Sequence, residues 1–255
     1  MNDAAPAGND ARDGGLADGS AVGPSTGRVL SGAGFENDIG EADPNLMAAL
    51  ADESDVLGLL AAIAGARLLV PIVAAPTGGD SADVAPQRST NMAVVTLTSP
   101  DGQRALPVFS SLAALLAWDA TARPSPVTGA DAARAAVSEG CDVLALDIRS
   151  GHPRVLRPSM VWALAQQRDW LPAHADPFVA QALSRATADE ADVIDCHGEE
   201  GDPAGAGILR VVLSLRPGLG QAQVQALATR VGEQIATDGE ARARIDGLAF
   251  AIREA

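Results

Sequence analysis

One stretch decides the fold of this chain: residues 67–118, which read RLLVPIVA (67–74), then AVVTLT (93–98), SPDG (99–102), RALPVF (104–109) and SSLAALLAW (110–118). The first segment has the length and the β-branched content of a strand buried on both faces, in which Pro71 is tolerated only at a sheet edge or a bulge. The next segments form a predicted hairpin, because Pro100 suits the first corner of a type I turn and Gly102 supplies a left-handed residue.

Helices and strands alternate on both sides of this stretch. Each predicted helix begins at a capping residue or at a proline in its first turn, and it continues with apolar residues at helical spacing. These helices are expected at 44–50 after Asp43, 56–65 after the polar run 52–55, 112–118 after Ser110 and Ser111, 130–138 after Thr128, 158–167, and from Pro177 after Asp176. Further strands are expected at 141–148 and 155–156, whereas Pro124 and Pro126 are interpreted as turn formers. The alternation predicts an α/β domain, a mixed sheet packed with helices.

The last third of the chain has a different pattern. Strands are expected at 193–197, 208–215 and 248–252, and the apolar residues between 224 and 235 form a helical stripe. The central strand places four apolar side chains on one face, which the helix can cover. The pattern predicts a small α+β domain with a three-stranded antiparallel sheet under one or two helices.

Composition divides the chain into three parts. Residues 1–42 are rich in Gly, Ala, Asp and Ser and are expected to be a disordered acidic tail. Residues 43–173 form the predicted N-terminal α/β domain and residues 174–255 the small C-terminal domain, with the boundary near 171–176, where two prolines cluster. A surface loop is expected at 76–88.

The net charge of -15 arises at the two ends of the chain. Residues 1–55 hold 11 acidic residues and 2 arginines, residues 56–188 hold 10 acidic residues and 10 arginines, and residues 189–255 hold 12 and 6. An acidic chain without a basic cluster is repelled by phosphate backbones and anionic lipid, so neither nucleic acid nor a membrane is an expected partner. Because the chain has no lysine, a P-loop, a Schiff-base lysine and Ser-x-x-Lys acyl-enzyme chemistry are excluded.

The sequence shows no signal peptide and no 18-residue apolar run, and its two cysteines lie far apart. The chain is therefore expected to be cytoplasmic and to lack a disulfide framework. No cofactor is expected.

One acidic segment, residues 192–202, brings soft and hard metal ligands together. Cys196 and His197 lie among five carboxylates there. Adjacent residues of a strand point to opposite faces, and no second Cys or His lies at the spacing of a zinc site. The segment is interpreted as a strand end that runs into a solvated acidic loop, with no metal site, although Cys196 and His197 are weak candidates for one.

No catalytic residue is predicted. His152 and His174 lie in proline-flanked turns, no Gly-x-Ser-x-Gly elbow is present, and Cys141 opens an apolar strand without nearby positive charge. An enzyme with dispersed residues is the alternative. It requires a cleft that holds at least two of the following within hydrogen-bond reach: Cys141, Asp147, His152, Arg154 and Arg157.

The candidate ligand-binding residues are Arg154, Arg157, Trp162 and Trp170. If the two tryptophans line a groove beside either arginine, charge and aromatic packing can hold an anionic ligand or an acidic peptide. Core filling is the favoured interpretation for Trp118 and Trp162, because large aromatic side chains dominate the cores of helix and strand sandwiches.

Several of these segments resemble one bacterial family. The residues that carry the resemblance are STNMAVVTLTSPDGQRALPVFSS (89–111), WD (118–119), ARP (122–124), AAVSEG (135–140) and DVL (142–144), together with Phe35, DP (43–44) and 67–73. On these residues the chain resembles the SseB family, named for enhanced serine sensitivity, in its actinobacterial form. The resemblance implies that residues 26–185 are the family's N-terminal domain and that the remainder is its smaller C-terminal domain. It brings with it no catalytic residues and no established activity.

Three functions follow from these observations as hypotheses. The favoured one is a non-enzymatic binding or regulatory module with a link to amino-acid (serine) metabolism, whose partner is a protein or a small molecule. The alternative is an enzyme of amino-acid or sulfur metabolism. The third is a structural or assembly protein that uses an exposed apolar patch.

Overall fold

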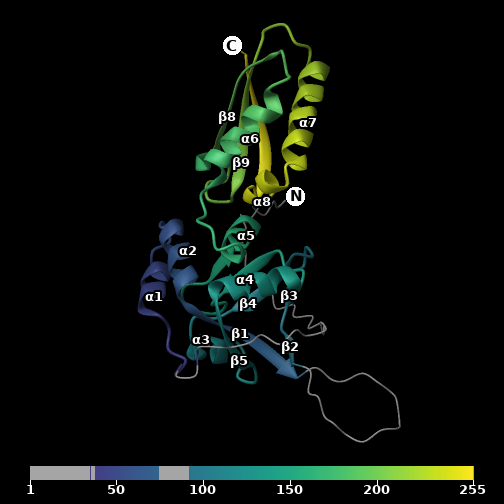
Figure 1. Cartoon of the computed structure of the whole chain (residues 1–255). Helices are drawn as coiled ribbons and strands as arrows, with labels where there is room; N and C mark the ends of the chain where they lie inside the picture. Colours follow the sequence, from purple (N-terminus) through teal and green to yellow (C-terminus); the bar gives the residue numbers. More distant parts are fainter. Residues whose placement is uncertain (1–34, 36–37, 75–91, 255) are drawn as a thin grey trace, which may run out of the picture.

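The structure, a computed structural model, describes residues 35, 38–74 and 92–254, and it is an α/β fold with more than one domain (Figure 1). Its elements follow in this order: α1 (Pro44–Ala51), α2 (Val56–Gly65), β1 (Arg67–Ala74), β2 (Met92–Val94), β3 (Leu97–Thr98), β4 (Arg104–Val108), α3 (Leu112–Trp118), β5 (Arg123–Thr128), α4 (Gly129–Ser138), β6 (Val143–Leu146), β7 (Arg154–Leu156), α5 (Pro158–Ala165), the 3-10 helix η1 (Ala173–Ala175), α6 (Pro177–Thr187), β8 (Val193–Glu200), β9 (Ile208–Leu215), α7 (Gln221–Thr237), α8 (Gly239–Arg244) and β10 (Gly247–Glu254). The loop predicted at 76–88 and most of the predicted acidic tail lie outside the described residues. None of the helices that the structure describes has the length and the apolar content needed to cross a membrane.

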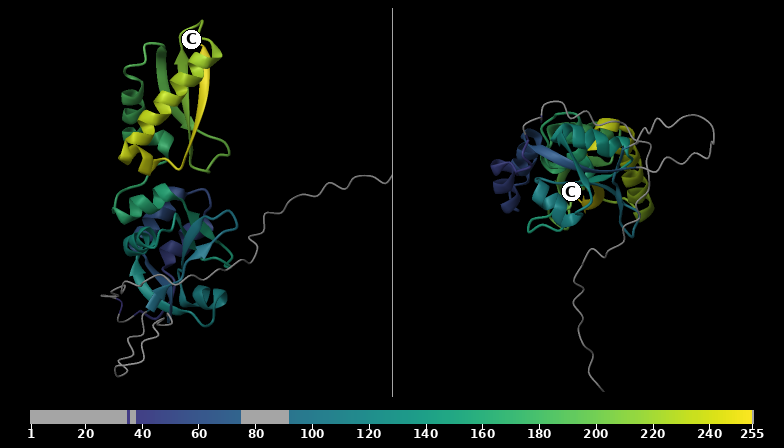
Figure 2. Two further views of the ribbon diagram at one scale, coloured as in Figure 1. Left: turned by 90° about the vertical axis from the view of Figure 1, so that its right-hand side faces the viewer. Right: turned by 90° about the horizontal axis from the view of Figure 1, so that it is seen from below.

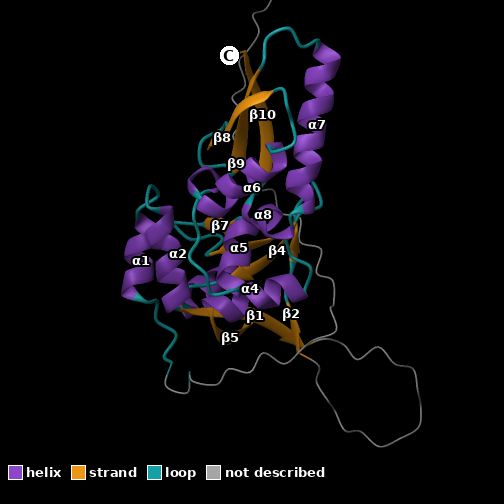
Figure 3. Ribbon diagram, turned by 45° about the horizontal axis from the view of Figure 1, so that its top comes forward, coloured by secondary structure: helices purple, strands orange, loops and turns teal. Residues whose placement is uncertain are grey.

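Two small sheets form the N-terminal part of the chain. The first has the strand order β2-β1-β5 and the second the order β3-β4-β6-β7. Within the described strands of these two sheets, β4 and β6 are the only parallel neighbours. The sheets are joined where the Leu69 amide donates to the Phe109 carbonyl at 2.8 Å and the Leu69 carbonyl accepts from the Phe109 amide at 2.9 Å. Helices α2, α4 and α5 pack with these strands around one apolar core, so the predicted α/β class is confirmed (Figure 3).

The predicted hairpin is confirmed. The amide of Gly102 donates to the carbonyl of Ser99 at 2.9 Å, and Gly102 has a φ of 89°, which glycine adopts without steric cost. The strand predicted at 93–98 is divided, however, because β2 pairs with β1 whereas β3 pairs with β4. The chain therefore crosses from one sheet to the other just before the turn.

Two predictions about proline are wrong. Pro71 lies in β1, the central strand of its sheet, and its carbonyl accepts from the Val95 amide at 3.2 Å just beyond the last residue of β2. Pro71 therefore lies at the end of the β1–β2 ladder, where its lack of an N–H costs no hydrogen bond between the two strands. Pro124 and Pro126 do not form a turn but lie in the edge strand β5. Because they are two residues apart, the backbone nitrogens of both face away from β1, where no ladder hydrogen bond is lost.

Capping side chains begin the helices as the sequence predicts. The oxygens that accept from the first free amides of α1, α3, α4 and α6 belong to Asp43, Ser111, Thr128 and Asp176. Gly140, with a φ of 64°, follows the end of α4. These interactions are local in sequence, which is why they are readable without the fold.

The C-terminal part is a three-stranded sheet of order β10-β9-β8, with α6 and α7 packed on one face (Figures 1 and 2). The antiparallel arrangement predicted for this sheet is wrong for one pair, because β10 runs parallel to β9 while β8 is antiparallel to it. The reason is the long helical connection through α7 and α8, which returns the chain to the starting end of the sheet. The domain boundary near 171–176 stays a prediction.

The tryptophans predicted to fill the core differ. Trp118 is half-buried and packs on the fully buried Phe109, with 5.3 Å between the ring centroids. Trp162 is also half-buried, but its ring is flanked by the guanidinium groups of Arg168 and Arg244 at 5.5 and 5.1 Å. Its predicted core position is therefore wrong, because its face of α5 meets α8 rather than the sheet.

Candidate functional site

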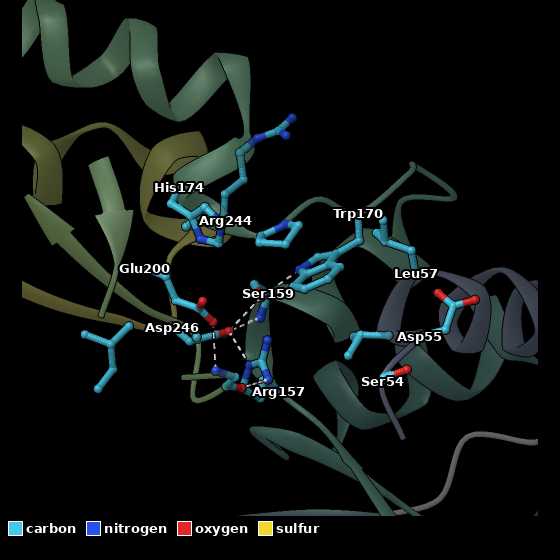
Figure 4. Close-up of a pocket in the computed structure, with 16 residues that line it drawn as sticks. Ser54, Asp55, Leu57, Arg157, Ser159, Trp170, His174, Glu200, Arg244 and Asp246 are labelled. Atoms are coloured by element: carbon cyan, nitrogen blue, oxygen red, sulfur yellow. Dashed lines mark hydrogen bonds and ion pairs between the residues drawn. The ribbon is translucent and has the colours of Figure 1, made fainter. Parts of the chain in front are cut away.

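A cleft with a volume of about 270 Å³ lies where the N-terminal and C-terminal elements meet (Figure 4). One wall comes from the start of α2, the start of α5 and Trp170, and the other from the segment before α6, the β8–β9 connection and the end of α8. Its lining residues are Ser54, Asp55, Val56, Leu57, Arg157, Ser159, Trp170, Pro172, Ala173, His174, Glu200, Gly205, Gly207, Ile208, Arg244 and Asp246. The cleft thus combines an indole and aliphatic side chains with charged groups of both signs.

Asp246 holds the two walls together. Its carboxylate accepts from the Ser159 amide at 2.7 Å, from the Ser159 hydroxyl at 2.8 Å and from Nε of Arg157 at 2.9 Å. Arg157 is the N-cap residue of α5 but supplies no side-chain cap of its own. A carboxylate from the C-terminal part therefore caps a helix of the N-terminal part, where the helix dipole favours negative charge.

The indole of Trp170 is fixed by the same network. Its Nε1 donates to the Ser159 hydroxyl at 3.0 Å, and the guanidinium carbon of Arg157 lies 5.6 Å from its ring centroid. Arg157 also donates to the carbonyl of Gly205. The indole and the guanidinium are therefore pre-positioned at the cleft.

Gly207 is required by this geometry. Its φ is 81°, and a Cβ built there comes within 2.5 Å of a carboxylate oxygen of Asp246 and 2.6 Å of Nε of Arg157. Both neighbours are held by the network, so neither can move aside without breaking it. Any side chain at position 207 would disrupt the contact between the walls.

A second network crosses between the two parts beside the cleft. Arg244 donates to Asp176 at 2.6 Å and to Glu240 at 2.8 Å, and Arg168 of the N-terminal part donates to the same Glu240 oxygen at 2.7 Å. The hydrogen bond from Arg244 lowers the pKa of Glu240 below its ordinary value. Trp162 lies between these arginines. It therefore belongs to this second network.

The structure brings two of the four predicted ligand-binding residues to the cleft, namely Arg157 and Trp170. Trp162 does not line the cleft, because its ring packs against Arg168 and Arg244 of the second network. Arg154 points elsewhere, since it donates to the carbonyl of Leu50 at 2.6 Å and pairs with Glu53 at 3.3 Å, beside a smaller neighbouring hollow.

The residues named for an enzyme are dispersed. Asp147 is buried and accepts from the amide and hydroxyl of Ser110 at 2.8 and 2.6 Å. Cys141 is buried, and that burial raises the pKa of its thiol. His152 is exposed in a loop. Of the five candidates only Arg157 lines the cleft, and the smaller hollow brings it together only with Arg154, a second cation to which it forms no hydrogen bond.

Two polar residues of the cleft, Ser159 and Asp246, were not singled out from the sequence. They stand in no recognisable motif and belong to different parts of the chain, the start of α5 and the connection between α8 and β10. The one sequence signal was the glycine-rich stretch 205–207, which marks a close approach of backbone to another group.

The segment with Cys196 and His197 is part of a strand. The prediction that the strand ends before an acidic loop is wrong, because β8 continues to Glu200 and pairs with β9 along its length. Cys196 packs against the apolar core under the helices, and burial raises its pKa to about 11.

His197 lies on the opposite face, as predicted. One ring nitrogen is 2.8 Å from Asp195 and the other 3.3 Å from Glu199, and the hydrogen bond with Asp195 raises the pKa of the imidazole. Glu199 also accepts from Arg210 and Arg253 at 3.0 Å each. In the described ranges, no three side chains of His, Cys, Asp or Glu are grouped so that they can hold a metal ion.

Comparison with known proteins identifies the N-terminal part. Residues 45–163 match the family model of the SseB protein N-terminal domain. This match supports the assignment of the chain to the SseB family through its N-terminal domain. Comparisons with curated proteins and with solved structures found no match.

Proposed function

We propose that this protein is a non-enzymatic binding module whose ligand occupies the cleft between its two parts. The observation that carries the proposal is the network of Asp246, Ser159 and Arg157, which fixes Trp170 at the cleft before any ligand arrives. Pre-positioned groups bind with a smaller loss of conformational entropy, so such a wall favours recognition of a small molecule.

A regulatory role follows from the position of the cleft. A ligand that contacts both walls favours the state in which they are joined, and it shifts that equilibrium by its difference in affinity for the two states. The family resemblance adds the proposed link to serine and other amino acids. A partner that is neither nucleic acid nor membrane belongs to the same proposal and rests on the net charge of -15. A cytoplasmic location is also proposed, and it rests on the two distant cysteines, which indicate no disulfide framework.

The proposal is tested by NMR on the full chain labelled with nitrogen-15. The three tryptophans give three indole signals, which Trp170→Phe and Trp118→Phe assign. Serine, the other free amino acids, and simple organic acids and amines are added in turn. We expect at least one compound to shift the Trp170 signal in a saturable way while the Trp118 signal stays in place.

His174→Ala, which removes a side chain from the cleft wall, should weaken that binding severalfold, whereas His152→Ala, which removes an exposed histidine outside the cleft, should not. If no compound shifts the Trp170 signal, the proposal is wrong. If both histidine variants weaken binding equally, the ligand lies outside the cleft.

A further inference from the structure

A second hollow of about 270 Å³ adjoins the cleft and lies between α2 and α5. Nine of its eleven lining residues are apolar, and they are Leu57, Leu60, Ala61, Ala64, Met160, Ala163, Leu164, Trp170 and Leu171. Leu57 and Trp170 line both spaces, so these two side chains form the wall between them (Figure 4). Leu57 is 48% exposed, which leaves it free to move aside.

The charged groups of the cleft differ in whether they form ion pairs within the protein. Asp246 accepts three hydrogen bonds, two from Ser159 and one from Arg157, and its charge offsets that of Arg157. The guanidinium of Arg244 is paired with Asp176 and Glu240. Both arginines of the cleft are therefore neutralised by protein carboxylates.

Two carboxylates of the cleft have no such partner. Glu200 accepts one backbone hydrogen bond, from the Gly205 amide at 2.9 Å, and Asp55 accepts one, from the Gly58 amide at 2.8 Å. Within the described part of the chain, neither Glu200 nor Asp55 forms an ion pair with a basic side chain. The unbalanced charge of the cleft is therefore negative, beside an apolar hollow.

We infer that the ligand is a primary amine that carries an apolar group, with its ammonium at Glu200 and its apolar group inserted past Trp170 into the second hollow. An ammonium donates up to three hydrogen bonds and accepts none, which matches carboxylates with spare lone pairs. The apolar walls of the second hollow favour a group without polar atoms. This inference rests on the proposed binding function and names its ligand class, and it replaces the anionic ligand expected from the arginines.

The test uses simple amines as probes of the full chain, with the Trp170 indole signal as the readout and the Trp118 signal as an internal control. Methylamine, n-butylamine and n-hexylamine are compared with hexanoate and hexanol at constant ionic strength. Burying one methylene lowers the dissociation constant about fourfold, so n-hexylamine should bind at least tenfold more tightly than n-butylamine. Hexanoate and hexanol should bind at least tenfold more weakly than n-hexylamine.

Two pairs of variants locate the two ends of the amine. Glu200→Gln keeps an oxygen for the Gly205 amide but removes the charge, and it should weaken n-hexylamine at least tenfold, whereas Glu254→Gln should leave its affinity within twofold. Ala64→Leu fills the second hollow from an exposed helical position and should abolish the gain from chain length. Ala117→Leu, at an exposed position of α3, is its control and should leave that gain intact.

The outcomes separate this inference from the proposed function. If hexanoate or hexanol shifts the Trp170 signal more strongly than n-hexylamine, the cleft binds ligands but the amine assignment is wrong. If n-hexylamine binds equally well to the Glu200→Gln protein, or gains nothing over methylamine, the assignment is wrong too. If none of these probes and no amino acid shifts the Trp170 signal, both the assignment and the proposed function are wrong.

Discussion

Nε of Arg157 lies 2.9 Å from a carboxylate oxygen of Asp246, and the two residues are 89 positions apart in the chain. The same carboxylate caps the N-terminus of α5 through the Ser159 amide, so one side chain joins the two parts, caps the start of a helix and positions the wall of the cleft. Stability and binding are therefore expected to depend on the same residue.

Replacing Asp246 tests this coupling. The side chain of Asp246 is 8% exposed and that of Arg157 24% exposed, so Asp246→Ala leaves a partly buried arginine without its partner. We expect the free energy of unfolding to fall by about 3 kcal/mol, the lower end of the range for a buried pair, since Arg157 regains some water. Urea unfolding followed by tryptophan fluorescence measures it. Asp202→Ala, which removes a 92% exposed partner of Arg210, is the control and should change stability by less than about 0.5 kcal/mol.

The aromatic pair of Phe109 and Trp118 gives a graded prediction. Phe109 is fully buried, so Phe109→Ala should cost about 3 to 5 kcal/mol of unfolding free energy, whereas the half-buried Trp118 should cost about 1 to 3 kcal/mol when truncated to Ala. Thermal and urea unfolding of both variants gives the comparison. A larger loss at Trp118 than at Phe109 would contradict the burial order.

The stability of the folded protein is expected to depend on pH through His197. Its pKa is raised above the ordinary 6.5, first by the hydrogen bond with Asp195, so the folded protein binds this proton more tightly than the unfolded chain does. Its contribution to stability is therefore complete below pH 6.5 and is lost as the pH rises through the folded value. NMR titration should give an imidazole pKa above 6.5 that falls in Asp195→Asn. Wild type and His197→Gln should differ more in stability at pH 5.5 than at pH 8.5; a larger difference at pH 8.5 would reverse the sign and contradict the assignment.

The two cysteines should react slowly in the folded protein. Burial raises the pKa of Cys196 to about 11 and raises that of Cys141 as well, and the thiolate is the reactive form. Iodoacetamide at pH 8 should therefore alkylate both far more slowly in buffer than in urea, as measured by intact mass. Rapid labelling of one site in buffer would show that its thiol is accessible and ionised.

Metal binding by Cys196 and His197 is predicted to be weak. The two side chains lie on opposite faces of β8, so they cannot approach one ion together. Purified protein should carry far less than one equivalent of zinc or nickel, and a chelator should not change its melting temperature. Cys196→Ala with His197→Ala should keep the fold. Stoichiometric metal that this double substitution removes would contradict the structure of the strand.

Features that depend on neighbours in sequence were predictable. The turn at Gly102, the caps at Asp43, Ser111, Thr128 and Asp176, and the strand and helix patterns all use hydrogen bonds or periodicity within a few residues. The sequence alone also determined the SseB resemblance, which the match over residues 45–163 bears out.

Features that depend on distant partners were decided only by the tertiary structure. Whether Pro124 and Pro126 form a turn or an edge strand depends on β1, and whether β10 runs parallel depends on the helices before it. The partner of Arg157 was equally unreadable, because Asp246 lies in an ordinary connection between α8 and β10. The sequence determined which residues are charged, apolar or turn-forming; only packing decided which charges are neutralised within the protein and which are left for a ligand, because that balance is set between side chains that meet only once the chain has folded.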